Sequence, residues 1–479
     1  MRTKKEFDNF IEEQIKDALD PSVTVSIVKG DKVIYEGAFG YADVANEIMA
    51  TPNTRYSIAS CTKAFTATAI GILVDRGLMN FEDLLTKHLP EFKMQDEYVL
   101  KNLKIKDMLC HRSGLPRHDY AWYANPLSKE EELKRIAYFK PNVSFREKWQ
   151  YCNYMFMTLG MVVAKVSGKT WEQFVKEEII DPLKMESTNY SLIDNVWEQA
   201  KGYKEIEGRI EEVEYYDFLV DGKSSLESSG GICSTVHDLL PWMMLNLHEG
   251  NYQGKQIVSK ESLAEIHTSQ MIVSGYLPKR AEFTLPTYGF GWFINSFHGK
   301  KMVHHSGSMD GFISWVSLIP EDDIGIAVLS NLDLTKLPER LTYALYEFIY
   351  DLPVADWNKY FVELKEKVKR EKDEKAVSFW EKRDTNKKLT KELIDYVGTY
   401  ADEGYGIINI TLENDDLYYS AKRFKPRMKH YQGDEFIIDI LDEDYLITFI
   451  FDDNGEITEF TIPLEKAENA EPITFKRRR

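Results

Sequence analysis

The sequence predicts a mixed α/β protein of the α+β kind, with an antiparallel sheet flanked by helices and a small all-β barrel after it. A β-hairpin pattern opens the chain at residues 23–35, and aromatic and β-branched runs predict an antiparallel meander over residues 287–332. Evenly spaced strand patterns follow residue 396, which suits a small barrel or sandwich. We expect the hairpin and the meander to share one sheet on which helices pack.

Local patterns in the first eighty residues predict two helices around the hairpin. Residues 1–20 place isolated Phe and Ile residues at helical spacing among Lys and Glu, which is typical of an amphipathic helix and not of a signal peptide. Residues 23–35 alternate apolar and polar side chains on both sides of a Gly-Asp turn. Residues 60–77 have one apolar helical face, and Gly77 stands where a C-terminal cap belongs.

The rest of the chain divides into three regions. Residues 80–250 show mostly helical periodicity broken by loops, and residues 359–391 are a highly charged, helix-compatible stretch that suits a linker. Five further strands are predicted, at 407–412, 417–420, 435–440, 445–451 and 457–462. We therefore predict a main domain over 1–352, a charged helical linker over 353–392 and a barrel over 393–479.

Composition excludes several classes of protein. At 479 residues the chain is longer than the ~250–300 residues at which a single hydrophobic core stops growing, so we expect two domains. A net charge of −18 argues against a nucleic-acid partner, because phosphate contacts need a basic surface. The longest apolar stretch, 155–166, is too short to span a bilayer, so no membrane partner and a cytoplasmic location are expected. Four widely spaced cysteines without a CxxC pair predict free thiols: Cys61, Cys110, Cys152 and Cys233.

Two Ser-x-x-Lys pairs are candidates for an activated serine. A lysine amine can reach the serine hydroxyl when both lie on a helix, because positions i and i+3 share a face. Ser26 and Lys29 lie in the first predicted strand, where residues three apart point to opposite faces. Ser60 and Lys63 begin a predicted helix, whose N-terminal dipole would favour an oxyanion. Geometry selects Ser60, although the pair alone also fits a helix-capping serine followed by a solvated lysine, so additional residues must decide.

A second motif, Tyr151-Cys152-Asn153, directly precedes an apolar helix over 154–167. A tyrosine near a lysine ammonium can have a lowered pKa and act as a general base, and Asn153 can orient a substrate amide. A competing Tyr123-Ala124-Asn125 has no such helix after it. A buried tyrosine that is hydrogen-bonded for packing is the alternative for either motif.

A third motif, His305-Ser306-Gly307, lies at the edge of the late meander and is followed by Ser308. Glycine allows close approach of the strand backbone to a ligand, and the N–H of Ser308 could act as an oxyanion donor beside that of Ser60. His305 is a candidate hydrogen-bond donor or auxiliary acid. The alternative is a histidine at a strand end without a role in catalysis.

In this order, the three motifs resemble those of the serine β-lactamases and DD-peptidases (penicillin-binding proteins), in particular the class C-like branch with its esterases, D-aminopeptidases and transesterases. The resemblance covers roughly residues 5–350, and residues 393–479 resemble the lipocalin-like barrel appended to some members. Four supporting segments look similar too: 56–59, 111–116, 229–235 and 307–312. The resemblance implies that an α/β part and an all-helical part enclose the site between them.

The resemblance also implies acyl transfer through a covalent intermediate. Ser60 would attack a carbonyl, Lys63 and Tyr151 would share the proton, and the N–H groups of Ser60 and Ser308 would hold the oxyanion. No metal or organic cofactor is expected. The substrate would be a small molecule or a short peptide.

His305 stands where β-lactamases and DD-peptidases usually carry lysine, as in the esterases and peptidases of the family. Because histidine is mostly uncharged at neutral pH, we expect β-lactamase activity to be weak at most. The cleaved bond is left open among an ester, a D-amino-acid amide, a short peptide and a lactam. Loops 117–145 and 270–285 are expected to set specificity, and the barrel is expected either to cap the site or to build a homo-oligomer.

Two other hypotheses compete with a serine hydrolase. Cys61 and Cys152 adjoin catalytic candidates, but Cys61 would point about 100° around the helix from Ser60. A catalytically silent ligand-binding protein of the same fold is the alternative from a different class. The joint presence of Ser60, Lys63 and Tyr151 argues against it.

Overall fold

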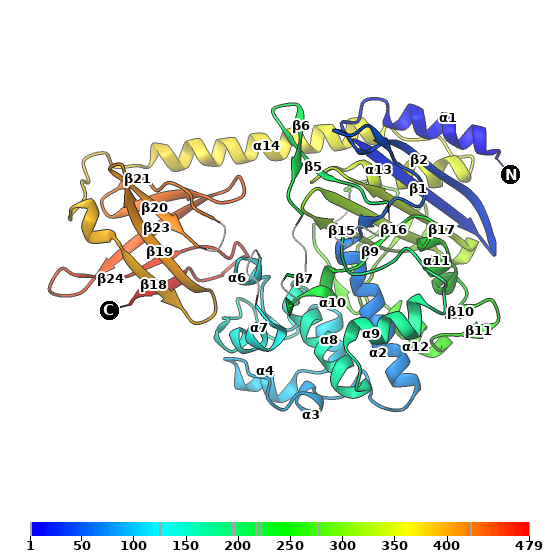
Figure 1. The fold of residues 1–479 in the computed structure, drawn as a ribbon, viewed down its shortest axis with the longest axis horizontal. Helices are drawn as coiled ribbons and strands as arrows, with labels where there is room; N and C mark the ends of the chain where they lie inside the picture. The colour runs from blue at the N-terminus through cyan, green and yellow to red at the C-terminus, as the bar shows by residue number, and fades with distance from the viewer. Residues whose placement is uncertain are drawn as a thin grey trace.

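A computed structural model describes residues 2–123, 127–192, 198–215, 219–220, 223–275, 278–421 and 424–478. Its main domain is built on a nine-stranded antiparallel sheet in the order β12-β13-β14-β15-β16-β17-β1-β2-β3 (Figure 1). The strands are β1 (Ser22–Lys29), β2 (Lys32–Asp43), β3 (Ile48–Met49), β12 (Met271–Ile272), β13 (Thr287–Tyr288), β14 (Phe293–Phe297), β15 (Lys300–Met309), β16 (Phe312–Ile319) and β17 (Ile324–Ser330).

The predicted hairpin and the predicted meander meet in this sheet. β1 pairs with β17 in an antiparallel register that runs from Val23 opposite Ser330 to Lys29 opposite Ile324. β1 also pairs with β2 across the predicted turn. The prediction of one sheet shared by the two ends of the main domain is confirmed.

Helices cover both faces of the sheet. On one face, α1 and α13 bury residues such as Phe7 and Leu341 against the apolar sides of β1 and β17. On the other face lie α2, α8 and α11, which belong to a larger, mostly helical layer. The helices of the main domain are α1 (Lys4–Ile15), α2 (Thr62–Asp75), α3 (Leu85–His88), α4 (Glu97–Asn102), α5 (Ile105–Leu109), α6 (Asp119–Trp122), α7 (Lys129–Arg135), α8 (Asn153–Ser167), α9 (Trp171–Val175), α10 (Glu227–Gly230), α11 (Leu239–Leu247), α12 (Lys260–Ile266) and α13 (Leu337–Ile349).

The middle region is less purely helical than predicted. Short hairpins interrupt it, because segments such as 202–213 alternate charged and apolar residues around a Glu-Gly turn. The short strands outside the main sheet are β4 (Tyr56–Ser57), β5 (Gly202–Ile206), β6 (Arg209–Val213), β7 (Leu219–Val220), β8 (Lys223–Ser224), β9 (Cys233–Ser234), β10 (Asn251–Tyr252) and β11 (Lys255–Gln256).

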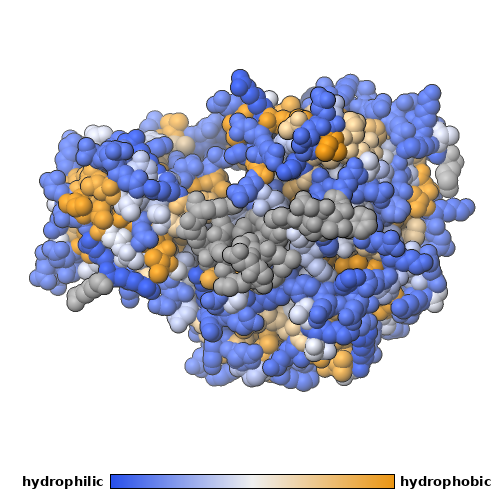
Figure 2. Space-filling view, viewed as in Figure 1, coloured by the Kyte–Doolittle hydropathy of each residue, from blue (hydrophilic) through white to orange (hydrophobic). Residues whose placement is uncertain are grey.

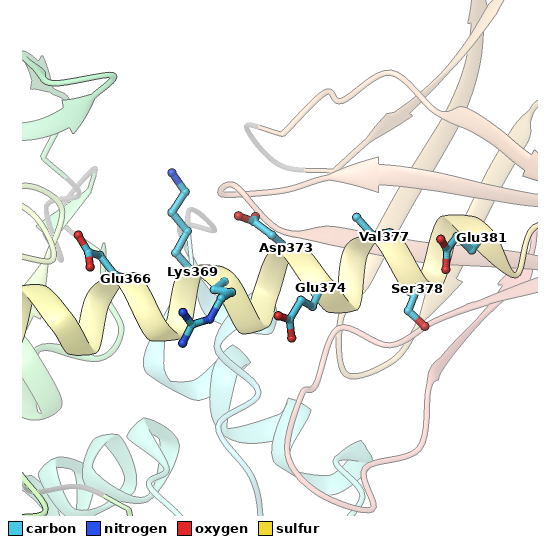
Figure 3. Close-up of a pocket in the computed structure, with 8 residues that line it drawn as sticks. Glu366, Lys369, Asp373, Glu374, Val377, Ser378 and Glu381 are labelled. Carbon is cyan, nitrogen blue, oxygen red and sulfur yellow. The ribbon is translucent and has the colours of Figure 1, made fainter.

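A single long helix, α14 (Trp357–Glu381), leads from the main domain to the barrel along one side of the molecule (Figure 1). Trp357 and Phe361 are buried, which anchors its first turns on the main domain. Its later turns project charged side chains, among them Glu366, Lys369 and Asp373 (Figure 3). The helix occupies most of the predicted linker, and the division at residues 352 and 393 stays a prediction.

The barrel is an eight-stranded antiparallel sheet in the order β20-β19-β18-β25-β24-β23-β22-β21. It nearly closes, because residues 424–428 run back along β20, with the Met428 N–H donating to the Leu417 carbonyl at 2.8 Å. The strands are β18 (Gly398–Asp402), β19 (Gly406–Glu413), β20 (Asp416–Ser420), β21 (Lys429–Gln432), β22 (Glu435–Asp439), β23 (Asp444–Phe451), β24 (Ile457–Ile462) and β25 (Ile473–Arg477). The predicted all-β barrel is confirmed, with β18, β21 and β25 as strands that sequence analysis missed.

The surface agrees with the composition of the chain. Hydrophilic residues predominate on the face shown in Figure 2, on the main domain and on the barrel alike. None of the helices in the described ranges is both long and apolar enough to cross a bilayer. The four cysteines are all described, and each is buried and free, as predicted.

Candidate active site

The candidate nucleophile Ser60 lies in a short 3₁₀ turn, Ala59–Cys61, that leads directly into α2. Ala59 is buried and has a φ of +43°, a left-handed conformation that a non-glycine residue adopts only when its surroundings enforce it. The turn and the helix together place Lys63 on the face that carries Ser60. The Lys63 Nζ atom lies 3.2 Å from Ser60 Oγ.

Lys63 is fully buried, and two acceptors besides its neighbour Ser60 hold its amine. It donates to Asn153 Oδ1 at 2.8 Å and to the carbonyl of Ser229 at 2.6 Å. Burial lowers the pKa of Lys63 well below its ordinary value, and the nearby charge of Arg117 lowers it further. The neutral amine is therefore favoured next to Ser60.

Tyr151 faces Lys63 with its ring. Lys63 Nζ lies 4.6 Å from the ring centroid, and the Arg117 guanidinium carbon lies 4.8 Å from it. The His111 ring lies 4.4 Å from the Tyr151 ring, and His111 Nδ1 accepts the Cys152 N–H at 3.2 Å. The segment before α8 is thus packed against the lysine, and the role of Tyr151 as a general base stays a prediction. Of the competing motif, Ala124 and Asn125 lie outside the described residues.

Asn153 is joined to two charged residues that sequence analysis did not single out. Its Nδ2 donates to Asp119 Oδ1 at 3.0 Å, and Asp119 pairs with Arg117 at 2.5 Å. Both polar ends of the Asn153 amide are therefore held within the protein, one by Asp119 and one by Lys63. No local pattern marks Arg117 and Asp119, because they become neighbours of Asn153 only through the tertiary fold.

The third motif lies on β15 and approaches the nucleophile turn closely at Gly307. A Cβ atom added to Gly307 would lie 2.1 Å from the carbonyl oxygen of Ile58 and 2.4 Å from Ser314 Oγ. The backbone of the nucleophile turn therefore requires glycine at this position. Ser308, the next residue, lines the same cavity as Ser60.

His305 is buried, and both of its ring nitrogens are engaged. Nδ1 lies 2.6 Å from the carbonyl oxygen of Ser306, which can only accept, so Nε2 accepts from the Tyr288 hydroxyl at 3.0 Å. Burial lowers the pKa of His305 to about 3. His305 is therefore neutral at physiological pH and offers neither a cation nor an available proton, and neither it nor Ser306 lines the cavity.

The Ser60 cavity, which we define as the hollow that contains Ser60, Asn153 and Ser308, has a volume of about 980 Å³. Its walls come from the loop 117–123, the hairpin β5–β6, the end of β15 and two barrel segments, 441–445 and 464–466. The predicted specificity loop 117–145 therefore contributes residues to the lining of the cavity. The described part of the other predicted loop, 270–285, contributes none.

The lining of the Ser60 cavity is strongly acidic. Three of its described residues are cationic, namely Arg117, Lys204 and Lys466. Nine are acidic: Asp119, Glu211, Glu212, Glu214, Asp310, Asp333, Asp442, Glu443 and Glu465. A shallower hollow along α14, shown in Figure 3, carries charged side chains around Val377 and Ser378 but no histidine, cysteine or tyrosine among its described residues. The side chains suited to catalysis therefore lie at the Ser60 cavity and not at the hollow along α14.

The cysteines next to the motifs are buried and do not line the Ser60 cavity. Cys61 Sγ lies 3.3 Å from the His305 carbonyl oxygen and 3.3 Å from Ser314 Oγ, against the sheet. Burial raises the pKa of Cys61 and of Cys152 to about 12 in each case. Since the thiolate is the nucleophilic form, neither thiol suits a cysteine enzyme. In the described ranges, no group of three or more His, Cys, Asp or Glu side chains could hold a metal ion.

A family model described as Beta-lactamase matches residues 7–347, well over half of the chain. The chain belongs to the Beta-lactamase family. A second model, described as a domain of unknown function (DUF3471), matches residues 382–477. The resemblance seen in the three motifs is therefore confirmed at the level of the family, whose members are generally serine hydrolases.

Relatives of this Beta-lactamase family chain include the protein flp of Staphylococcus aureus (strain MW2), which is 28% identical over 351 residues. That match covers 71% of this chain and 66% of flp, so the chain spans just under two thirds of its relative. The unguisins hydrolase ungD' of Aspergillus campestris is 27% identical over 390 residues, which cover 76% of this chain and 70% of that protein.

Two solved structures show the same fold along the whole chain. The octameric penicillin-binding protein homologue from Pyrococcus abyssi has a TM-score of 0.63 at 23% identity and covers 98% of this chain and 99% of its own. The structure of SurE has a TM-score of 0.59 at 18% identity, with 99% of each chain covered. These likenesses confirm the β-lactamase-like fold with its appended barrel.

Proposed function

We propose that this chain is a serine hydrolase that cleaves an ester or amide bond through an acyl-enzyme on Ser60. The observation that carries the proposal is the buried Lys63 amine, 3.2 Å from Ser60 Oγ. A neutral amine has two hydrogens and one lone pair. Asn153 Oδ1 and the Ser229 carbonyl accept the two hydrogens, which leaves the lone pair to accept the Ser60 hydroxyl proton.

The reaction then follows from these contacts. Lys63 takes the proton as Ser60 Oγ bonds to the substrate carbonyl carbon, and the N–H groups of Ser60 and Ser308 are the proposed donors to the oxyanion. Lys63, with Tyr151 beside it, returns a proton to the departing alcohol or amine as the carbon–oxygen or carbon–nitrogen bond breaks. Water then attacks the acyl-enzyme and releases the acid, and Ser60 regains its proton.

The charge of the Ser60 cavity favours one group of substrates over another. A cleft lined by one sign of charge attracts ligands of the opposite sign and repels those of the same sign. Nine carboxylates against three cations, with a neutral His305, disfavour a substrate that presents its own carboxylate, as carboxypeptidase substrates and penicillins do. We propose an aminopeptidase-like or esterase-like activity on small molecules or short peptides that carry an ammonium group.

The test is hydrolysis of p-nitrophenyl acetate, p-nitrophenyl butyrate, the D-Ala and L-Ala p-nitroanilides and nitrocefin by wild type and by Ser60→Ala in parallel. Activity that disappears in Ser60→Ala supports the proposal and identifies the acyl class. Activity that survives in the variant places the chemistry elsewhere. If the wild type cleaves nothing and resists a fluorophosphonate probe, the second candidate, a catalytically silent ligand-binding protein, is favoured.

We also propose that the chain forms a homo-oligomer. The structural neighbour from P. abyssi is described as octameric and aligns over nearly the whole of both chains. Light scattering coupled to size exclusion gives the mass directly, and a monomeric mass at all concentrations would contradict this proposal. The cytoplasmic location stays a prediction.

A further inference from the structure

We propose that the barrel is part of the catalytic apparatus, because Glu465 and Tyr405 hold the loop 117–119 in the conformation that orients Asn153 and Lys63. The inference rests on the proposed function of the Ser60 cavity and goes beyond it. It assigns positioning roles to two residues that lie more than 300 positions after the nucleophile.

The contact is made at His118, which lies between Arg117 and Asp119. Its backbone N–H donates to Glu465 Oε2 at 2.8 Å, and its Nδ1 lies 2.8 Å from the Tyr405 hydroxyl. The His118 ring is buried and stacks on Phe139 at a centroid distance of 4.2 Å. The barrel therefore fixes both the backbone and the side chain of this residue.

The loop needs such support because of its backbone. His118 has a φ of +49°, a left-handed conformation that is unfavourable for a residue with a side chain. Residues in such conformations persist where the surrounding structure enforces them. The two barrel contacts at His118 supply that constraint. They act on the residue that joins Arg117 to Asp119 at the start of α6.

The loop in turn sets the hydrogen bonds of the lysine. Asp119 Oδ1 can only accept when ionised, so it selects the orientation of the Asn153 amide in which Nδ2 faces Asp119. Oδ1 of the same amide then faces Lys63 and takes one of its two hydrogens. If Asp119 moves, the amide is free to rotate and to present its NH₂ group to Lys63, which removes one of the acceptors that keep the lone pair directed at Ser60.

The barrel also makes contacts with the main domain that do not touch this loop. Glu471 pairs with Lys140 at 2.7 Å, and Glu468 pairs with Lys148 at 3.1 Å, both on the exposed rim of the interface. These contacts attach the barrel through charged side chains that do not line the Ser60 cavity. Glu471 therefore provides a matched control for Glu465.

The experiment compares Glu465→Leu, Glu465→Gln, Tyr405→Phe and Glu471→Leu in the full-length protein, with p-nitrophenyl acetate as a small, uncharged substrate. We expect kcat of Glu465→Leu to fall about 10-fold with KM within about 2-fold, because the geometry of the base is disturbed and substrate binding is not. Glu465→Gln keeps an acceptor for the His118 N–H and should retain at least about a third of kcat. Tyr405→Phe should fall between the two, and Glu471→Leu should match wild type.

A second readout does not depend on catalysis. Hydrogen exchange of peptides that cover 117–119 and 151–153 should accelerate in Glu465→Leu and not in Glu471→Leu. An unchanged kcat and unchanged exchange in a folded Glu465→Leu would overturn the inference, as would a loss of activity that follows only the unfolded fraction. If the wild type proves inactive on every substrate, the proposed function fails, and the exchange data still decide whether the barrel holds the loop.

Discussion

Replacing Gly307 by alanine should separate the nucleophile turn from β15 and slow acylation. The added Cβ would lie 2.1 Å from the Ile58 carbonyl oxygen, whereas ordinary contact begins at 3.4 Å. The strand and the turn must therefore separate by about 1.3 Å if this one contact is to be restored. Ile58 is two residues before Ser60, so the nucleophile moves with it. Since a displacement of about 1 Å can cost about 100-fold in rate, we expect kcat/KM to fall about 100-fold, or about 2.7 kcal/mol.

The assay is hydrolysis of the best substrate in the panel, with the folded fraction measured by thermal unfolding. Gly250→Ala is the control, because its Cβ would lie 2.0 Å from the Val258 carbonyl oxygen at a site outside the Ser60 cavity, and its φ of +83° adds backbone strain to the overlap. That variant should lose stability but keep kcat per folded molecule within about 3-fold. A Gly307→Ala enzyme with wild-type kcat/KM, or two variants with equal losses of kcat, would refute the reasoning.

Three further predictions concern the charges and thiols of the site. Because burial lowers the Lys63 pKa, the fraction of neutral amine grows as pH rises through that lowered pKa. The value of kcat/KM should therefore rise with pH and level off well below the ordinary lysine pKa, and Lys63→Ala should cost at least about 100-fold. At low salt, kcat/KM for a p-nitrophenyl ester of an ammonium-bearing acid should be about 10-fold higher than for the carboxylate-bearing counterpart. If this difference in kcat/KM does not shrink as salt is added, the role given to the acidic lining is contradicted. Native protein should resist iodoacetamide at pH 8, since the Cys61 and Cys152 pKa values are near 12, and rapid labelling of either thiol detected by mass spectrometry would reopen the cysteine hypothesis.

The parts of the fold that could be predicted are those set by local periodicity. The hairpin 23–35 and the meander 287–332 alternate with a period of two, and the sheet that joins them follows from burying their apolar faces. β18, β21 and β25 were missed because each is only four or five residues long and alternates weakly. Their place in the barrel depends on the neighbouring strands and not on their own composition.

The residues of the candidate site also divide into those that local spacing predicts and those that only the tertiary fold brings together. Ser60 and Lys63 could be paired from sequence because a separation of three residues on a helix is a local property. The partners Asp119 and Glu465 could not, since their proximity to Asn153 and His118 depends on how the main domain and the barrel pack. The neutral state of His305 also follows from burial, which no pattern around the residue reveals.

The helix α14, which connects the main domain to the barrel, restricts the changes in its own length that the protein can accommodate. At about 1.5 Å and 100° per residue, the 25 residues of α14 extend about 37 Å and fix the rotational phase of the barrel as well as its distance. Removing one residue would turn the barrel by about 100° and carry Glu465 away from His118. Removing seven would nearly restore the phase but draw the barrel about 10 Å inward. The length of α14 therefore sets both the distance and the rotation of the barrel relative to the main domain. We expect this length to vary far less than the charged residues of the helix.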